Sequence, residues 1–227
     1  MKMLGIYGFL LTRLYGRSPG RTVFMSILPL LGVVLAFIPF DAKGSDEYVI
    51  GIMISGYTTL FACYMAFVFL SMDISGSRLM RTCPEAKALY TRGLAGVCTL
   101  IGAVCAAVTL GARAATTIIM GEDINVLSDL MIGLGTAFVP VCVIPLLSML
   151  RYGMIAMVYL PIAEGVLCVF VPDEIKTNGF GAPMWAAALI MAGCIAASTV
   201  LSRIMCELAY AKMNFRPYVQ TQQQITH

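Results

Sequence analysis

The chain has 227 residues, of which 59% are hydrophobic and only 12% charged, with a formal net charge of +3 and a mean hydropathy of +0.88. Soluble domains carry about 25% charged residues, so this composition excludes an ordinary soluble domain and indicates an integral membrane protein. The small positive charge reflects the loops between apolar segments and gives no indication of nucleic-acid binding.

Residues 2–17 predict an amphipathic helix that lies in the membrane surface instead of crossing it. Small residues recur at every third or fourth position, and Arg13 and Arg17 lie beside them. The remaining wide face is apolar, so we expect it to rest on the lipid bilayer while both arginines reach the headgroups. The sequence leaves open whether this helix is only an anchor or also touches a partner.

Six apolar runs follow, each close to the roughly 20 residues that cross a bilayer core. We expect spans at residues 22–40, 48–72 and 93–112, two more within 130–172, and the last at 183–201. Within the long fourth block, Arg151, Tyr152 and Gly153 predict a tight turn between two antiparallel spans. The predicted fold class is therefore an all-α integral membrane protein with six transmembrane helices preceded by an N-terminal interfacial helix.

Lys and Arg are concentrated on one side of these spans. With the N-terminus in the cytoplasm, 12 of the 15 fall on the cytoplasmic side, and only Lys43, Arg113 and Lys176 fall on the outer side. Short loops rich in Lys and Arg stay in the cytoplasm, so we expect both termini there, including the polar tail 217–227. The chain is then one transmembrane domain, residues 1–227, of a multi-pass plasma-membrane protein of bacterial type.

The longest cytoplasmic loop, residues 73–92, joins the second and third spans and is rich in charge. Thr82 and Glu85 have the spacing of a helix capping box, and Pro84 is tolerated in a first turn, which predicts a short helix over 83–92. Four apolar or small side chains share one face of this helix: Ala86, Leu89, Tyr90 and Gly93. The positive charge alone is explained by orientation, whereas the cap and the apolar face suggest a docking surface.

One acidic residue, Glu164, falls near the centre of the predicted fifth span. A charge there costs about 2.5 to 3.5 kcal/mol on insertion scales, so we expect Glu164 to be protonated or to face a partner or water. Its neighbours by depth are Tyr57, Thr58 and Thr59 of the second span. These residues can line a substrate path or a subunit interface, or can form an interhelical hydrogen bond that only fixes packing. Pro140 and Pro145 should kink the preceding span.

The sequence gives little indication of catalysis. The single histidine, His227, is the last residue, and the chain has neither a G-x-x-x-x-G-K-[ST] phosphate loop nor a G-x-S-x-G nucleophile elbow. We therefore expect no catalytic residues, no metal site and no cofactor in this chain.

Over its whole length the chain resembles the membrane (permease) subunit of a type-2 ABC (ATP-binding cassette) exporter. The resemblance rests on an interfacial helix before six spans, two cytoplasmic termini, a long second cytoplasmic loop with a short helix, and a minimal loop between the fourth and fifth spans. It implies a translocation path formed with a second membrane subunit, identical or related, and a separate cytoplasmic ATPase subunit that binds ATP-Mg. The implied ATPase contact residues are Arg78, Arg81, Pro84, Glu85, Lys87 and Arg92.

Two other classes of protein fit the same pattern. A substrate-binding membrane subunit of an energy-coupling-factor vitamin importer would need a ligand pocket near the outer surface and would purify with a bound vitamin. A non-transport membrane immunity or assembly protein would work without an ATPase. Within the exporter class, the sequence names neither the transported substrate nor the pairing, homodimer or heterodimer.

Overall fold

The computed structural model describes residues 3–16, 18–37, 48–75, 85–121, 125–149, 159, 162–163, 165–166 and 169–212. Within these ranges every regular element is a helix, which confirms the predicted all-α class. Five of the described helices form the body of the molecule: α2 (Pro19–Phe37), α3 (Tyr48–Ser75), α6 (Leu94–Met120), α7 (Asn125–Val141) and α11 (Met184–Lys212). The shorter elements are α1 (Met3–Gly16), α5 (Ala86–Ala88), the π-helix η1 (Leu89–Gly93), α8 (Ile144–Met149) and α10 (Asp173–Asn178).

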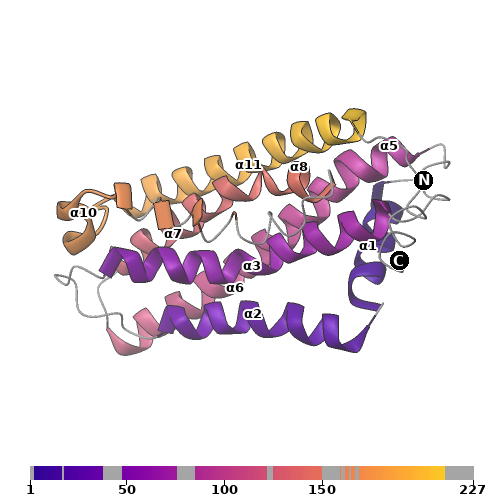
Figure 1. The fold of residues 1–227 in the computed structure, drawn as a ribbon. Helices are drawn as coiled ribbons and strands as arrows, with labels where there is room; N and C mark the ends of the chain where they lie inside the picture. The colour runs from indigo at the N-terminus through magenta and orange to yellow at the C-terminus, as the bar shows by residue number, and fades with distance from the viewer. Residues whose placement is uncertain are drawn as a thin grey trace, which may run out of the picture.

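The bundle is built around α3, which packs against α2, α6, α7 and α8. Figure 1 shows α2, α3 and α11 running lengthwise, with α1 lying across one end of the bundle and α10 at the opposite end. We call these the α1 end and the α10 end. On the side of α3 away from α2, α11 covers α7 and α8.

Several helices are suited to a membrane. Four described helices are long and apolar enough to cross one: Tyr48–Ile74, Ala86–Ile119, Asn125–Leu146 and Met184–Lys212. The pair α1 and α2 adds a fifth candidate, although its two helices meet at an angle of 103°. The first, second, third, fourth and sixth predicted spans each overlap one of these helices. The predicted fifth span falls mostly outside the described residues, so the number six stays a prediction.

The third span is longer than its apolar run. The sequence predicts an end near Ala112, but α6 continues as one helix to Met120. The stopping point is Gly121, whose φ of 67° lies in the left-handed region and whose N–H bonds to the backbone oxygen of Thr117. Glycine adopts this helix-ending conformation without steric cost, whereas Arg113 is a good helix former and does not stop the chain.

The helix of the predicted fourth span is interrupted between the two prolines expected to kink it, Pro140 and Pro145. Pro140 lies inside the last turn of α7, which ends at Val141, and a short turn precedes α8 at Ile144. Within this turn the N–H of Val143 bonds to the backbone oxygen of Pro140 at 3.3 Å. Pro145, in the first turn of α8, lacks the N–H that would bond to the backbone oxygen of Val141 and continue the helical ladder, so the break falls just before it.

Glycines allow the long helices to approach closely. A Cβ on Gly56 of α3 would lie 2.9 Å from the backbone oxygen of Gly133 of α7. A Cβ on Gly135 would lie 3.0 Å from the Cα of Met191 in α11. Helices in membranes associate through such close backbone contacts because lipid provides little hydrophobic drive between them.

Candidate functional site

The predicted coupling loop lies at the α1 end, where the structure describes its first and last parts. Asp73 belongs to the last turn of α3, and residues 85–93 lead into α6. Three of the predicted ATPase contacts fall outside the described residues and stay predictions: Arg78, Arg81 and Pro84.

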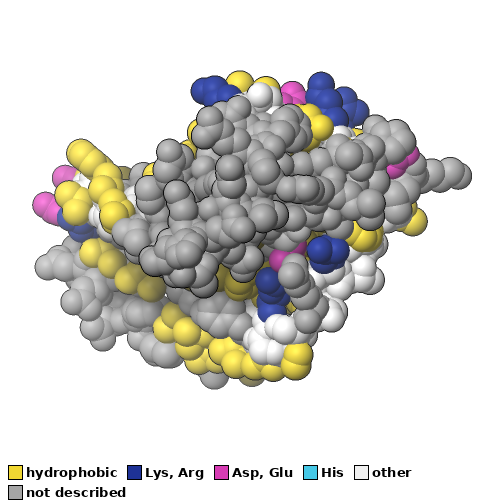
Figure 2. All heavy atoms as spheres, turned by 45° about the vertical axis from the view of Figure 1, so that its right-hand side comes forward, with side chains coloured by type: hydrophobic (Ala, Val, Ile, Leu, Met, Phe, Trp, Pro, Cys, Tyr) yellow, Lys and Arg dark blue, Asp and Glu magenta, His cyan; other side chains and the backbone are white. Residues whose placement is uncertain are grey.

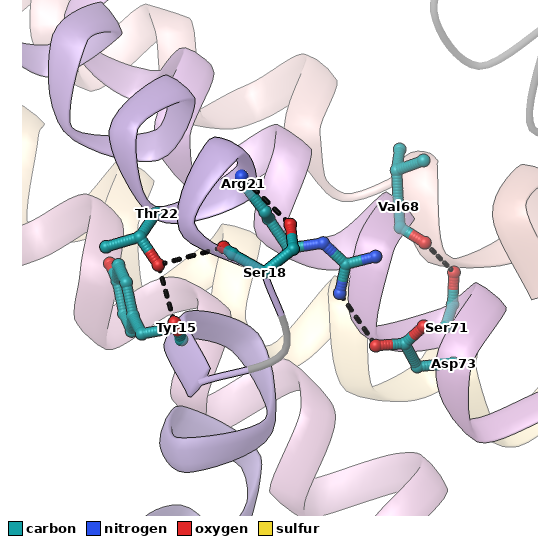
Figure 3. Close-up of polar contacts among 7 residues, drawn as sticks. All are labelled: Tyr15, Ser18, Arg21, Thr22, Val68, Ser71 and Asp73. Atoms are coloured by element: carbon teal, nitrogen blue, oxygen red, sulfur yellow. Dashed lines mark hydrogen bonds and ion pairs between the residues drawn. The ribbon is translucent and has the colours of Figure 1, made fainter.

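Asp73 is tied to α2 by an ion pair. Nη1 of Arg21 lies 2.7 Å from Oδ2 of Asp73, and these side chains are only 17% and 6% exposed. The guanidinium also lies over the ring of Phe69, 4.5 Å from its centroid. Figure 3 shows the Arg21 side chain reaching from α2 to Asp73 on α3. Charge-assisted hydrogen bonds shielded from water are the strong ones, so this pair holds the start of α2 against the end of α3.

The elbow between α1 and α2 is held by caps on both helices (Figure 3). Ser18 precedes α2, and its Oγ accepts a hydrogen bond from the backbone N–H of Arg21 at 3.1 Å. Pro19 then takes the first helical position, where no N–H is needed. On the other side, the hydroxyl of Thr22 donates to the backbone oxygen of Tyr15, one of the carbonyls that α1 leaves unpaired at its end. These two hydrogen bonds stabilise the sharp angle between α1 and α2.

Residues 85–93 do not form the separate helix predicted over 83–92. Glu85 stands at the N-cap of α5, but its side chain makes no capping hydrogen bond, and the proposed partner Thr82 lies outside the described residues. From α5 the chain continues through η1 into α6 without interruption. Gly93, the one residue here that favours a break, keeps a helical φ of −64°. The described part of the predicted coupling helix is therefore the first part of the third span. The π-helix η1 connects α5 to α6 there.

The predicted apolar face of this segment exists, but it packs inside the chain. Ala86 and Tyr90 are 4% and 0% exposed. Tyr90 donates its hydroxyl to the backbone oxygen of Ile74, in the last turn of α3, at 2.5 Å. Its ring lies 5.5 Å from that of Tyr210 in α11. The face therefore joins α3 to α11, and the prediction that it forms a docking surface is wrong.

The N-terminal helix packs across the start of α6. Ile6, Leu10 and Leu14 recur every fourth residue and are no more than 2% exposed. A Cβ on Gly93 would lie 2.6 Å from Cγ2 of Ile6, so glycine allows this close approach. A stripe of the face expected to rest on lipid thus packs on protein, because i, i+4 and i+8 positions line one side of a helix.

Of the two arginines predicted to reach lipid headgroups, the structure describes Arg13. Arg13 is half-buried in α1, and its Nε is a buried atom that has no hydrogen-bond partner. Arg17 lies outside the described residues, so its role stays a prediction.

Two of the six predicted ATPase contacts are found exposed in the described part of the chain. Lys87 and Arg92 point to the surface, whereas Glu85 is half-buried. In Figure 2, which turns this end toward the viewer, Lys and Arg side chains stand at the top and the lower centre, and hydrophobic side chains follow the lower edge. The α1 end therefore presents basic groups that a partner protein can contact.

The second predicted site, around Glu164, is described only on its α3 side, because Glu164 lies outside the described residues. Tyr57 packs edge-on against the phenylalanine one turn further along, at 5.9 Å between ring centroids. Thr58 donates its hydroxyl to its own helix backbone at 2.8 Å, and Thr59 is fully buried. Successive helical residues point about 100° apart, so these three side chains do not line a single path.

Thr59 faces polar residues on α6 that the sequence reading missed. Its Oγ1 lies 3.4 Å from that of Thr109. Thr109, Arg113 and Thr117, which we call the α6 polar stripe, are 0%, 6% and 6% exposed. The sequence places Arg113 on the outer side, just beyond the third span, and that side stays a prediction; the structure shows that Arg113 lies within α6 and is buried. The sequence does contain a signal for this stripe: its three polar residues are spaced four apart, which places them on one face of a helix.

Comparisons with known proteins find no relative: no protein-family model, no curated protein and no solved structure significantly matches this chain.

Proposed function

We propose that this chain is the membrane-spanning subunit of an ATP-driven ABC exporter. It would have six spans and cytoplasmic termini in a bacterial plasma membrane, and would pair with a second membrane subunit around the translocation path. ATP-Mg would bind to a separate cytoplasmic ATPase subunit. Support comes from the helices of membrane-crossing length and from the excess of Lys and Arg on the side of loop 73–92.

The observation that carries this proposal is the attachment of the exposed charges to the rest of the bundle. Lys87 and Arg92 belong to the turns that also carry Tyr90 and Gly93. Through these two residues the same turns contact α3, α11 and α1. A partner that displaced the exposed charges would therefore move three helices together, as coupling to a translocation path requires. A loop kept in the cytoplasm only by its charge needs no such attachment.

The ion pair extends this attachment to a fourth helix. Asp73, the first residue of the predicted coupling loop, holds Arg21 of α2. Both ends of the loop are thus joined to the helix bundle, which favours transmission of force over a freely solvated connection.

The first experiment is to tag the chain, extract it gently from its native membranes and identify what co-purifies. A stoichiometric soluble protein with a phosphate-loop motif, together with vanadate-sensitive ATPase activity, is the expected result. Purification of the chain alone, without ATPase activity in several detergents, would refute the ABC assignment. A bound vitamin would instead favour the importer subunit.

The contact is tested by reversing both exposed charges, in a Lys87→Glu and Arg92→Glu double variant. We expect it to reach the membrane but to lose the co-purifying ATPase, because its positive contact surface has become negative. The matched control reverses two charges at the α10 end, Asp173→Lys with Lys176→Asp, which preserves that exposed ion pair in the opposite sense. Equal ATPase recovery from both variants would contradict the contact.

A further inference from the structure

The α6 polar stripe contains a charge buried within an apolar helix. Arg113 is the only charged residue of α6, and only 6% of it is exposed. It is the twentieth residue of a helix that begins at Leu94. At about 1.5 Å per residue, the helix rises roughly 30 Å before reaching it, which is the thickness of a bilayer core. An ionisable side chain buried in a membrane helix usually has a function.

One turn later on the same face, Thr117 has an unused hydroxyl. Its Oγ1 is buried and has no hydrogen-bond partner. The other three threonines of α6 all donate to their own helix backbone: Thr99, Thr109 and Thr116. A buried polar atom without a partner is destabilising, so its retention beside Arg113 needs a reason.

On α3, the hydroxyls of Thr59 and Ser55 form only long hydrogen bonds. Thr59 and Thr109 lie 3.4 Å apart, and Ser55 donates to the backbone oxygen of Gly32 at the same distance. These distances are at the long limit of hydrogen bonding, and hydroxyl hydrogens rotate toward a better acceptor when one arrives. Thr59 thus adds a weakly held hydroxyl next to Thr109, one turn before Arg113 on α6.

We propose that Arg113 and Thr117 bind an oxyanion, the phosphate or carboxylate group of a small molecule or of an amphiphile. An oxyanion accepts several hydrogen bonds at once and matches the fork of an arginine. Arg113 engages another group in the resting structure, but its five N–H donors allow it to exchange or share that partner. The existence of this anion site does not depend on the proposed function. Only the further step, that the bound anion is the exported substrate, rests on the proposed function.

Binding is tested on the purified full chain in a neutral maltoside detergent, with dodecyl phosphate and inorganic phosphate as probes. Isothermal titration measures affinity, and the fluorescence of the single tryptophan, Trp185, reports thermal unfolding. We expect saturable binding and a rise in Tm with at least one probe. Binding of dodecyl phosphate alone assigns the site to amphiphiles, and binding of both assigns it to the anionic group itself. If neither probe binds, the proposal is overturned.

Two variants and a neighbouring control separate ligand binding from a purely structural role. Arg113→Gln should weaken binding by more than about tenfold, since it removes the positive charge and the guanidinium fork, and Thr117→Val by about three- to tenfold, since it removes one hydroxyl donor. Thr116→Val changes a hydroxyl that already bonds to the backbone and should bind as the native chain does. Thr117→Val nearly preserves shape, so its unliganded Tm should not fall even if Arg113→Gln fails to fold. Equal affinity of Thr117→Val and Thr116→Val would overturn the site.

The binding assay needs no ATPase, so its outcome is independent of the test of the proposed function. Anion binding by a chain that purifies without an ATPase would refute the exporter assignment and leave the site intact. If the chain purifies with an ATPase but binds neither probe, the exporter assignment stands and the anion site is refuted.

Discussion

Arg21 in the first turn of α2 and Asp73 in the last turn of α3 are 52 residues apart in sequence and form an ion pair of 2.7 Å. Asp73 is the first charge of the predicted coupling loop, yet it is engaged within the chain. The pair, the caps at the α1–α2 elbow and the Tyr90 contacts together bind α1, α2, α3, α6 and α11 at one end of the bundle. This end therefore behaves as a junction to which a partner can attach.

Breaking the ion pair should destabilise the protein. Asp73→Asn leaves the largely buried Arg21 guanidinium without its counter-charge, and we expect a loss of about 1 to 3 kcal/mol. The measurement is thermal unfolding in detergent. The control is Glu207→Gln, which breaks the Arg203–Glu207 pair whose side chains are 46% and 43% exposed; exposed pairs contribute about 1 kcal/mol or less. Equal effects of the two substitutions would show that the Arg21–Asp73 pair has no special role.

The hydroxyl of Tyr90 should contribute measurably to stability. Tyr90→Phe removes the buried hydroxyl that donates to the backbone oxygen of Ile74, a change of about 1 to 3 kcal/mol. The comparison is Tyr64→Phe on α3, which removes a buried hydroxyl that has no partner and should be neutral or stabilising. Unfolding temperatures of the two variants measured side by side test this contrast. A Tm for Tyr90→Phe equal to that of the native chain would argue against the junction.

Helix packing at the α3–α7 crossing should not tolerate a methyl group. Gly56→Ala would place its Cβ 2.9 Å from the backbone oxygen of Gly133, so the helices must separate, at a cost of about 1 to 3 kcal/mol. Gly193→Ala on α11 meets nothing within 4 Å and should be neutral or slightly stabilising, since alanine favours the helix. Detergent-stability assays on both variants decide the question, and similar losses in both would contradict the observed close packing.

At the α10 end, the buried carboxylate of Asp129 links two segments by hydrogen bonds, and a substitution at the neighbouring Gly179 tests how much these bonds stabilise the protein. Asp129 is 1% exposed and accepts hydrogen bonds from the Tyr48 hydroxyl at 3.0 Å and the Phe180 N–H at 2.9 Å. Gly179 has a φ of 79°, and a Cβ on it would collide with the Asp129 carboxylate. Gly179→Ala should therefore lower stability through both backbone strain and the displaced carboxylate.

The control for this substitution is Gly181→Ala. Its φ of 61° is also positive, but a Cβ there meets nothing within 4 Å, so only backbone strain of about 1 kcal/mol is expected. The difference in Tm between the two variants reports the contact with Asp129 together with the extra backbone strain at Gly179, whose ψ of −176° at positive φ is accessible essentially to glycine alone. A control that loses as much as Gly179→Ala would show that the carboxylate tolerates displacement.

The candidate site was only partly predictable. The apolar positions of Ala86 and Tyr90 follow from helical spacing, and the structure confirms that they share a buried face. Their partners did not follow, because the sequence contains no signal that pairs Tyr90 with Ile74 or Tyr210. Charge patterning likewise did not reveal that Arg113 is buried inside α6, since counting charges on each side of the spans does not say which neighbours a side chain has.

By itself, the sequence determined that the chain is helical and suited to a membrane, since apolar length and the scarcity of charge act locally along the chain. It also determined the break between Pro140 and Pro145, because a missing N–H is a property of each proline alone. Only the tertiary structure decided which face each helix buries, that Asp73 joins Arg21, and that Thr59 meets Thr109. Those outcomes depend on which helices lie side by side, and in a chain so uniformly apolar that choice is made by small residues and scattered polar groups whose partners are distant in sequence.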